Sequence, residues 1–442
     1  MEQTRIIQPG GNSPDMRTQA MSDLNKTAMA GSIKALDLRC IPGNRYAIST
    51  EVSREHVLLQ LQSAPNVTGR RLPLNIALVV DRSGSMEGEP LDYVKRACGY
   101  VVDLLEPNDI LSVVTFAEQV DVLVPARRVV NKTLLKEHIN RIEVGNTTNL
   151  YDGLMVGCQQ VAASRSEGYV NRVLLLTDGD PTAGIKDFST IVGQAAEQKS
   201  RGITLTALGF GPDYNEELMA GIARRTGGNY YYISRPDLIP EVFRKELESL
   251  MTLVARNMRL RLGLSKWVQL RQAYGRSYTM SDARHAEINL VDMERGTAMS
   301  VLCEMEFAPH PAGIFRVMKA EIFYDDAASG RSEVLIGDVE FEFTADKAAV
   351  QSGINAMVRQ EIEIAQASRN LEKTVMGMKT QQISAMHATM ELHKTMNLLA
   401  AQGRNDEAAD VRKAIESIQS GGADAEKTLI GTIYNLDQGK TK

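Results

Sequence analysis

Three changes in hydrophobic periodicity divide the chain. Residues 1–32 are polar, carry Pro9-Gly10-Gly11 and show no period, which predicts a flexible N-terminal arm. From residue 33 apolar and polar positions alternate, as in strands with one buried face. Residues 72–254 alternate short apolar runs with segments in which apolar residues have helical spacing. In residues 345–442 the apolar residues follow helical spacing.

Strands of alternating pattern occur on both sides of the central region. We expect them at 33–40, 45–52 and 56–62, and again at 258–264, 267–271, 286–291, 298–307, 313–324 and 332–343. Three strands make a poor independent core, so residues 33–71 need the strands of residues 255–344 as partners. The pattern predicts one antiparallel β-sandwich into which residues 72–254 are inserted. Such an insertion is tolerated when the inserted domain has neighbouring termini.

Strands and helices alternate within the central region. The strands are expected at 75–81, 110–116, 120–124, 172–177, 204–208 and 230–233. The helices are expected at 91–105, 132–142, 150–165, 187–200, 215–225 and 238–254. This alternation predicts an α/β domain with a doubly wound, mostly parallel sheet that helices cover on both faces.

The C-terminal region, residues 345–442, predicts a bundle of three or four helices, with a break near Gly377. Its methionines, including Met386 and Met390, recur on the apolar stripe of these helices. We interpret this face as core filling rather than as a docking surface.

Composition narrows the class of protein. The chain has 442 residues, 43% of them hydrophobic, and a formal net charge of −5 with acids and bases interspersed. This balance gives no support to binding of nucleic acid or an anionic membrane. No uninterrupted apolar run approaches the length that spans a bilayer, and the first residues lack the apolar core of a signal peptide.

The cysteines are widely spaced and form no CxxC pair: Cys40, Cys98, Cys158 and Cys303. Free, buried thiols are therefore expected rather than disulfides or a metal site. Together with the missing signal peptide, they predict a cytoplasmic location.

The candidate chemistry begins at residues 74–86, LNIALVVDRSGSM. Asp81 ends an apolar strand, and Ser83 and Ser85 follow it with Gly84 between them. Open α/β sheets hold their ligands at this carboxyl edge. All the donors here are oxygens, which favours a hard cation such as Mg²⁺ over zinc.

The segment Asp81-Arg82-Ser83-Gly84-Ser85 fits the D-x-S-x-S signature of von Willebrand factor A domains. Residues 145–150, GNTTNL, resemble the threonine loop of that family, and residues 174–179, LLLTDG, resemble its strand-plus-aspartate segment. The three matches occur in the order found in the family, and the resemblance covers about residues 72–250. The C-terminal helices resemble those of bacterial proteins that also carry an A domain and a β-sandwich, so the resemblance is to the bacterial intracellular type of A-domain protein.

The resemblance implies an intact metal-ion-dependent adhesion site. By analogy Ser83 and Ser85 bind the ion directly, and Asp81 and Asp178 bind it directly or through water. Thr148 moves in or out of the ligand set as the domain switches state. The implied ion is Mg²⁺, with Mn²⁺ or Ca²⁺ as alternatives, and a Glu or Asp carboxylate of a protein partner fills its open position.

The expected function is therefore metal-dependent protein–protein interaction without enzymatic activity. In the family the change of state passes to the last helix, here residues 238–254, so we expect coupling between the metal site and the β-sandwich. The helical tail is also a candidate surface for self-association. Either that tail or the N-terminal arm is a candidate source of a carboxylate for the chain's own site.

Two other functions stay open. The first is a subunit of an AAA+ ATPase-driven chelatase or remodelling complex. The second is a metal-dependent hydrolase that uses Asp178 or Asp180, although no base, nucleophile or oxyanion donor accompanies them. Asp213 also resembles a family position, and we interpret it as a helix cap or a first-turn acid rather than a metal ligand.

Overall fold

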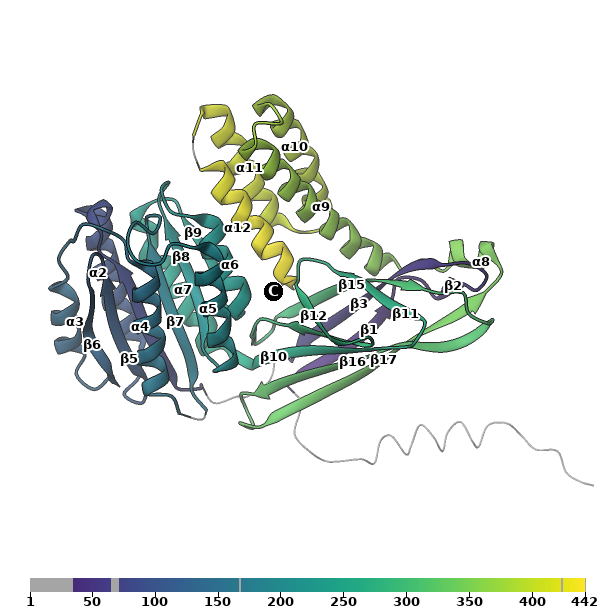
Figure 1. Cartoon of the computed structure of the whole chain (residues 1–442), viewed down its shortest axis with the longest axis horizontal. Helices are drawn as coiled ribbons and strands as arrows, with labels where there is room; N and C mark the ends of the chain where they lie inside the picture. Colours follow the sequence, from purple (N-terminus) through teal and green to yellow (C-terminus); the bar gives the residue numbers. More distant parts are fainter. Residues whose placement is uncertain (1–34, 65–70, 167, 423, 442) are drawn as a thin grey trace, which may run out of the picture. The chain divides into compact units, whose positions relative to one another are not determined.

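The computed structural model describes residues 35–64, 71–166, 168–422 and 424–441 (Figure 1). The expected N-terminal arm, residues 1–32, lies outside the described residues, as do the first two positions of the strand expected at 33–40. Within the described part, three β-sheets and a C-terminal group of helices are present.

The central sheet has six strands in the order β6-β5-β4-β7-β8-β9. β6 pairs antiparallel with β5, and the other neighbours are parallel. All eight residues of β4 are buried, which explains its nearly continuous apolar run. The strands are β4 (Leu74–Asp81), β5 (Ile110–Phe116), β6 (Val120–Arg128), β7 (Val170–Thr177), β8 (Thr204–Phe210) and β9 (Tyr230–Ile233).

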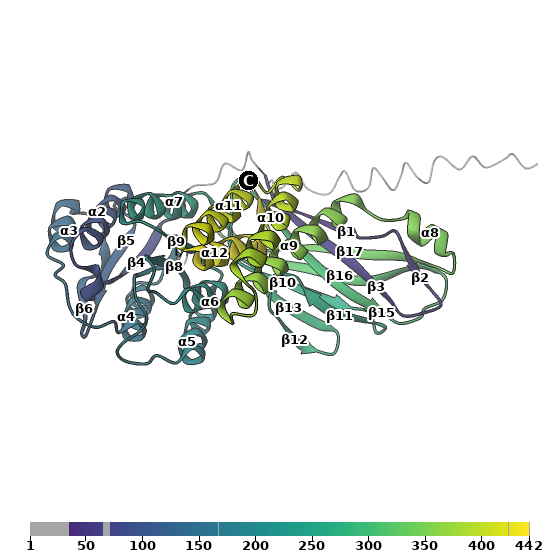
Figure 2. The ribbon, with the colours of Figure 1, turned by 90° about the horizontal axis from the view of Figure 1, so that it is seen from above.

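Helices cover both faces of this sheet, as Figure 2 shows. One core cluster joins Ile76, Leu78 and Val80 of β4 to α2 (Glu89–Leu104), α3 (Lys132–Asn140) and α7 (Ile239–Met251). A second cluster joins Ala77 and Val79 to α4 (Leu150–Ala163), α5 (Phe188–Ser200) and α6 (Glu216–Thr226). Successive side chains of β4 thus enter opposite cores, and the predicted α/β architecture is confirmed.

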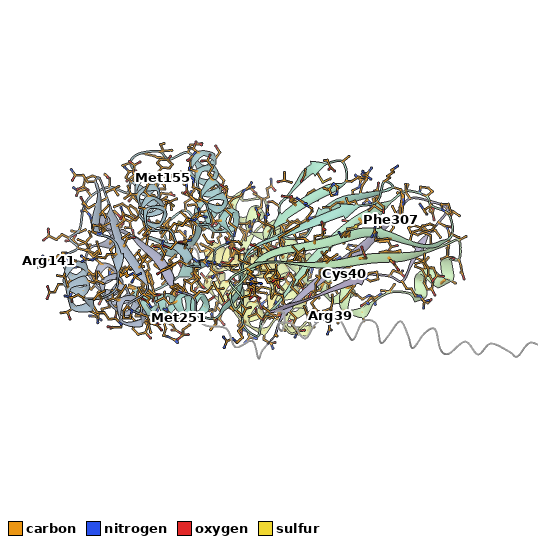
Figure 3. The ribbon with its side chains drawn as sticks, turned by 90° about the horizontal axis from the view of Figure 1, so that it is seen from below. Arg39, Cys40, Arg141, Met155, Met251 and Phe307 are labelled. Atoms are coloured by element: carbon orange, nitrogen blue, oxygen red, sulfur yellow. The ribbon has the colours of Figure 1, made fainter. Side chains whose placement is uncertain are left out.

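The last helix of the central region is shorter than expected. α7 ends at Met251, which Figure 3 labels, and the next strand begins at Leu253. The predicted helix over 238–254 was wrong at its end, because Leu253 and Val254 are apolar residues that suit a helix or a strand. Short 3₁₀ turns, η1 (Gly84–Met86) and η2 (Pro236–Leu238), complete the region.

Strands from both sides of the central region share two further sheets. β3 pairs antiparallel with β15, whereas β2 pairs parallel with β17, so the expectation of a purely antiparallel arrangement was wrong at that edge. The five-stranded sheet contains β1 (Leu36–Pro42), β3 (Ser53–Ser63), β15 (Ala298–Phe307), β11 (Val268–Ala273) and β18 (Lys440–Thr441). The seven-stranded sheet contains β12 (Tyr278–Asp282), β13 (His285–Asn289), β10 (Leu253–Leu264), β16 (Gly313–Asp326), β17 (Ser332–Thr344), β2 (Tyr46–Ile48) and β14 (Met293–Glu294). One cluster of buried side chains draws on both of these sheets.

The C-terminal region is helical, as predicted. It contains α8 (Lys347–Ser352), α9 (Ala356–Lys379), α10 (Ala385–Ala401), α11 (Asn405–Ser420) and α12 (Ala425–Gln438). The shared core of the last four helices includes Leu371, Leu392, Val411 and Leu429. α9 runs two residues past Gly377 before it ends.

The methionine face of these helices is largely not core. Met357, Met386 and Met390 are 44%, 84% and 51% exposed. Met378 and Met396 do pack against the core. The interpretation of this face as core filling was therefore wrong for the first three, because apolar spacing alone does not distinguish the buried side of a helix from its neighbouring side.

Two further sequence expectations can be compared with the described residues. All four cysteines are free, and three of them are buried, as predicted. Among the described helices, none has the length and apolar character needed to cross a membrane.

Candidate metal centre

The three loops with candidate ligands meet at the carboxyl edge of the central sheet. β4 and β7 are parallel neighbours, with Val80 opposite Leu176, so Asp81, which ends β4, and Asp178, which follows β7, lie at the same edge of the sheet. The amide of Gly145 donates to the Arg82 carbonyl at 2.6 Å, and the amide of Gly84 donates to the Asn146 carbonyl at 3.3 Å. These backbone hydrogen bonds fix the threonine loop, residues 145–150, against the loop that carries Ser83 and Ser85.

Asp81 lies at the bottom of the site and is fully buried. Its Oδ1 accepts a hydrogen bond from the Ser83 amide at 2.8 Å, and its Oδ2 accepts one from Thr177 Oγ1 at 2.5 Å. Burial raises the pKa of Asp81 to about 6, even though both hydrogen bonds act in the opposite direction. Two donors therefore do not offset the desolvation of this carboxylate.

Ser83, Ser85 and Asp178 form a connected series of oxygens. Ser85 Oγ donates to Asp178 Oδ1 at 2.8 Å, and the hydroxyl oxygens of Ser83 and Ser85 are 3.2 Å apart. Burial raises the pKa of the Asp178 carboxyl, and the negative charge of Asp213 raises it further. Ser83 and Asp178 are buried, whereas Ser85 is exposed, so the series runs from the protein interior to solvent.

Thr148 completes the group. Its amide donates to Thr182 Oγ1 at 2.8 Å, and its carbonyl accepts from the Thr182 amide at 3.0 Å. A Cβ atom placed on Gly179 would lie 3.7 Å from Thr148 Oγ1 and 4.0 Å from Ser85 Oγ. The hydroxyls of Thr148 and Ser85 therefore approach the same point, directly after Asp178, and all five residues singled out in the sequence lie together.

The donor chemistry fits a hard divalent cation. The site offers two carboxylates and three hydroxyls, and such all-oxygen sets suit Mg²⁺, Mn²⁺ or Ca²⁺ rather than zinc. Within the described ranges, no cluster of three or more His, Cys, Asp or Glu side chains could hold a metal. A cation here would depend on the hydroxyls as well as on Asp81 and Asp178.

Sequence analysis missed two supporting residues. Thr177 donates to Asp81, and its oxygen also accepts from the Gly179 amide at 3.3 Å. Thr182 binds the backbone of the threonine loop. A polar residue at the end of the apolar run 174–176 was a usable signal for Thr177, but Thr182 acts across 34 residues and left no local pattern.

Asp213 is not a helix cap, contrary to the expectation. The cap of α6 is Asn215, whose side chain accepts from the Leu218 amide at 2.9 Å, and the first-turn acids are Glu216 and Glu217. Asp213 lies earlier, in the bend after β8. The sequence had two suitable capping residues close together, and only the backbone distinguishes them.

A cavity of about 260 Å³ lies elsewhere, between α9, α12, β15 and the segment of residues 272–277. It is lined by polar side chains that include Arg276, Glu361 and Asp437, and none of the five candidate ligands lines it. The cavity is therefore separate from the candidate metal centre.

Comparison with known proteins agrees with this geometry. The family model of the von Willebrand factor type A domain matches residues 75–245. The uncharacterized protein sll0103 of Synechocystis sp. is 30% identical over 275 residues, which are 60% of this chain and 65% of that protein. The uncharacterized protein YfbK of Escherichia coli is 27% identical over 252 residues, or 56% of this chain and 44% of that protein. The chain thus spans less than two thirds of the length of either relative.

Two solved structures share the fold over most of the chain. A von Willebrand factor type A protein from Catenulispora acidiphila aligns with a TM-score of 0.71 and 16% sequence identity. The alignment includes 88% of this chain and 91% of that protein's chain. The ArnB paralog VWA2 from Sulfolobus acidocaldarius has a TM-score of 0.62 at 16% identity and covers 91% of this chain and 98% of its own. At 16% sequence identity, these two comparisons show a shared fold and nothing about function.

Proposed function

We propose, from the premise that residues 75–245 form a von Willebrand factor type A domain, that the protein is a metal-dependent protein-interaction module. Asp81, Ser83, Ser85, Thr148 and Asp178 would hold the cation, with Mg²⁺ as the proposed ion and Mn²⁺ or Ca²⁺ as alternatives. The supporting observation is that three loops bring two buried carboxylates and three hydroxyls together.

The charge balance of the site favours an acidic partner. Only two of the five side chains are anionic, so a bound divalent ion would retain Lewis acidity and offer a position to one further hard oxygen ligand. Ser85 is the exposed member of the group and marks the side from which a ligand would approach. A Glu or Asp side chain of a protein partner supplies such an oxygen.

We propose a binding role rather than an enzymatic one. The hydrogen-bond partners of the Ser85 hydroxyl are Ser83 and Asp178, not a histidine that could activate it as a nucleophile. Asp180, the other carboxylate considered for hydrolysis, is exposed. The four free thiols further support a reducing compartment such as a bacterial cytoplasm.

We also propose that the two flanking sheets pack as a β-sandwich that carries the A domain. Their shared cluster of buried side chains supports this arrangement.

A capture experiment with the full chain tests the proposed function. Lysate proteins are captured with Mg²⁺ or with EDTA on wild type, Asp178→Asn and the matched control Asp180→Asn. We expect a partner that is retained with Mg²⁺ by wild type and by Asp180→Asn, and lost with EDTA or with Asp178→Asn. Replacement of the partner's contacting Asp or Glu by its amide should also abolish capture.

Capture that ignores both EDTA and Asp178→Asn would contradict the proposal. A partner that is an AAA+ ATPase would instead identify the chain as a subunit of an ATP-driven complex. Turnover of a phosphoester or peptide that disappears in Asp178→Asn would identify a hydrolase.

A further inference from the structure

The bend at residues 211–215, between β8 and α6, lies beside the candidate metal centre. β7 and β8 are parallel, with Thr177 opposite Gly209, so the segments that follow them leave the sheet side by side. The ring of Tyr214 folds back over the end of β8, because a Cβ atom on Gly209 would lie 2.1 Å from Tyr214 Cε2. The bend carries Asp213, three residues after the end of β8, and the negative charge of Asp213 contributes to the raised pKa of the Asp178 carboxyl.

A lysine from the C-terminal helices holds this bend. Lys427 of α12 is only 6% exposed. Its Nζ donates to the Tyr214 carbonyl at 2.6 Å and to Glu216 Oε2 at 2.9 Å, and it lies 4.0 Å from the centre of the Tyr214 ring. A buried ammonium group with this set of partners is tightly localised, because each lost contact would leave a desolvated charge.

Further contacts press α12 against the same part of the A domain. Tyr434 packs in the core cluster of α4, α5 and α6, and its ring is 5.8 Å from that of Tyr230. The hydroxyl oxygens of Tyr230 and Tyr214 are 2.7 Å apart. Lys379 of α9 adds an ion pair to Glu216 at 2.6 Å. The bend is thus held by Tyr230 of β9 and by Lys427 of α12, and Lys379 adds a contact to the first residue of α6.

We propose that Lys427 is a positioning residue for the metal centre, holding the bend of residues 211–215 so that Asp213 remains close to Asp178. The inference rests on the proposed cation site. It adds that docking of α12 increases the affinity of that site, since an anionic side chain near Asp178 favours a cation there. By linkage, cation binding must stabilise the docked position of α12 to the same extent.

The same interface contains a matched control. Arg224, near the end of α6, pairs with Asp437 of α12 at 3.2 Å. This ion pair connects the same two helices, and the side-chain hydrogen bonds of Arg224 and Asp437 involve each other and Ser368, not residues 211–215. Arg224→Met therefore removes one charge contact of this interface while Lys427 still holds the bend, whereas Lys427→Met releases the bend.

The experiment measures Mg²⁺ affinity by calorimetry on the full chain, and amide hydrogen exchange without Mg²⁺. We expect Lys427→Met to weaken Mg²⁺ binding by about three- to tenfold and to speed exchange at residues 211–216. Arg224→Met should leave the affinity within about twofold of wild type. Glu216→Gln leaves the Lys427 side chain present but removes its ionic partner, so it should weaken binding in the same direction but less. This variant serves if Lys427→Met does not fold.

A double-mutant cycle with Asp213→Asn separates positioning from the direct charge of Lys427. If Lys427 acts through Asp213, the effect of Lys427→Met disappears in the Asp213→Asn background. An effect that persists there, an unchanged affinity in Lys427→Met, or tighter binding would overturn the inference while leaving the cation site intact. Wild type that binds no Mg²⁺ would instead overturn the proposed function, and this inference with it.

Discussion

Buried carboxylates lie at both ends of the central strand β4, and the two ends differ in the partners that the protein supplies to them. At the amino end, Asp109 is fully buried. Its carboxylate accepts hydrogen bonds from both terminal nitrogens of Arg71, at 2.9 and 2.6 Å, and from the Leu74 amide at 2.8 Å. At the carboxyl end, Asp81 is equally buried, but its partners are a backbone amide and a threonine hydroxyl. Within the described residues, neither Asp81 nor Asp178 forms an ion pair with a lysine, arginine or histidine. The charge of Asp109 is balanced by an arginine of the protein itself. The charges of Asp81 and Asp178 have no such partner and suit a cation from solution.

The largest effect should follow from breaking the ion pair of Asp109 with Arg71. Asp109→Asn leaves the guanidinium of Arg71 without its buried counter-charge, so we expect the free energy of unfolding to fall by about 3–5 kcal/mol. Urea unfolding with and without Mg²⁺ measures this loss, which should be the same in both. A loss that Mg²⁺ reduces would show that the two ends of β4 are not independent.

At the other end of β4, stability should depend on the cation. With Mg²⁺ at 100 times its dissociation constant, wild type should gain about 2.7 kcal/mol of unfolding free energy. Asp81→Asn should gain nothing from Mg²⁺, because it removes one of the two anionic ligands. The same urea titrations measure both values, and a full Mg²⁺ response in Asp81→Asn would remove Asp81 from the site.

Glu55 of β3 provides a third kind of carboxylate: among the described residues it forms no ion pair, and it belongs to no cluster that could hold a metal. Burial raises its pKa from 4.5 to about 7. Because the folded-state pKa lies above the unfolded value, its contribution to stability is present below pH 4.5 and is lost as the pH rises through about 7. Glu55→Gln should therefore stabilise the protein at pH 8 by about 1–3 kcal/mol and leave it unchanged at pH 4. Thermal melts at both pH values test this, and equal melting shifts at the two would contradict it.

The smallest effect should come from the ion pair nearest the site. Arg82, between Asp81 and Ser83, pairs with Asp121 at 2.9 Å, and the Asp121 side chain is 56% exposed. Asp121→Asn should change the unfolding free energy by at most about 1 kcal/mol, since exposed ion pairs contribute little. Calorimetry should find its Mg²⁺ affinity within about twofold of wild type. A large change in affinity would mean that Arg82 orients the first loop.

The sequence predicted the parts of the molecule that depend on local pattern. The α/β alternation and the C-terminal helices were confirmed, and the residues singled out for the metal site do converge, because parallel strands bring their carboxyl ends to one edge. That they bind a metal stays a prediction.

The failures share a physical cause. The predictions for the end of α7, the cap of α6 and the methionines were wrong. In each case two different local structures are compatible with the same residue pattern. The contacts of Lys427 with Tyr214 and Glu216 join residues more than 200 positions apart, and no periodicity records them. Pairing across such distances follows from tertiary packing alone.

The most direct test of the comparison is calorimetric titration of Mg²⁺ into wild type, Asp178→Asn and Asp180→Asn at pH 7.5. We expect wild type and Asp180→Asn each to bind one Mg²⁺ with equal affinity. We expect Asp178→Asn to bind Mg²⁺ at least about tenfold more weakly, a loss of about 1.4 kcal/mol. Equal binding by all three proteins, or no binding by wild type, would contradict the claim that the buried carboxylates at the carboxyl end of the sheet hold a cation.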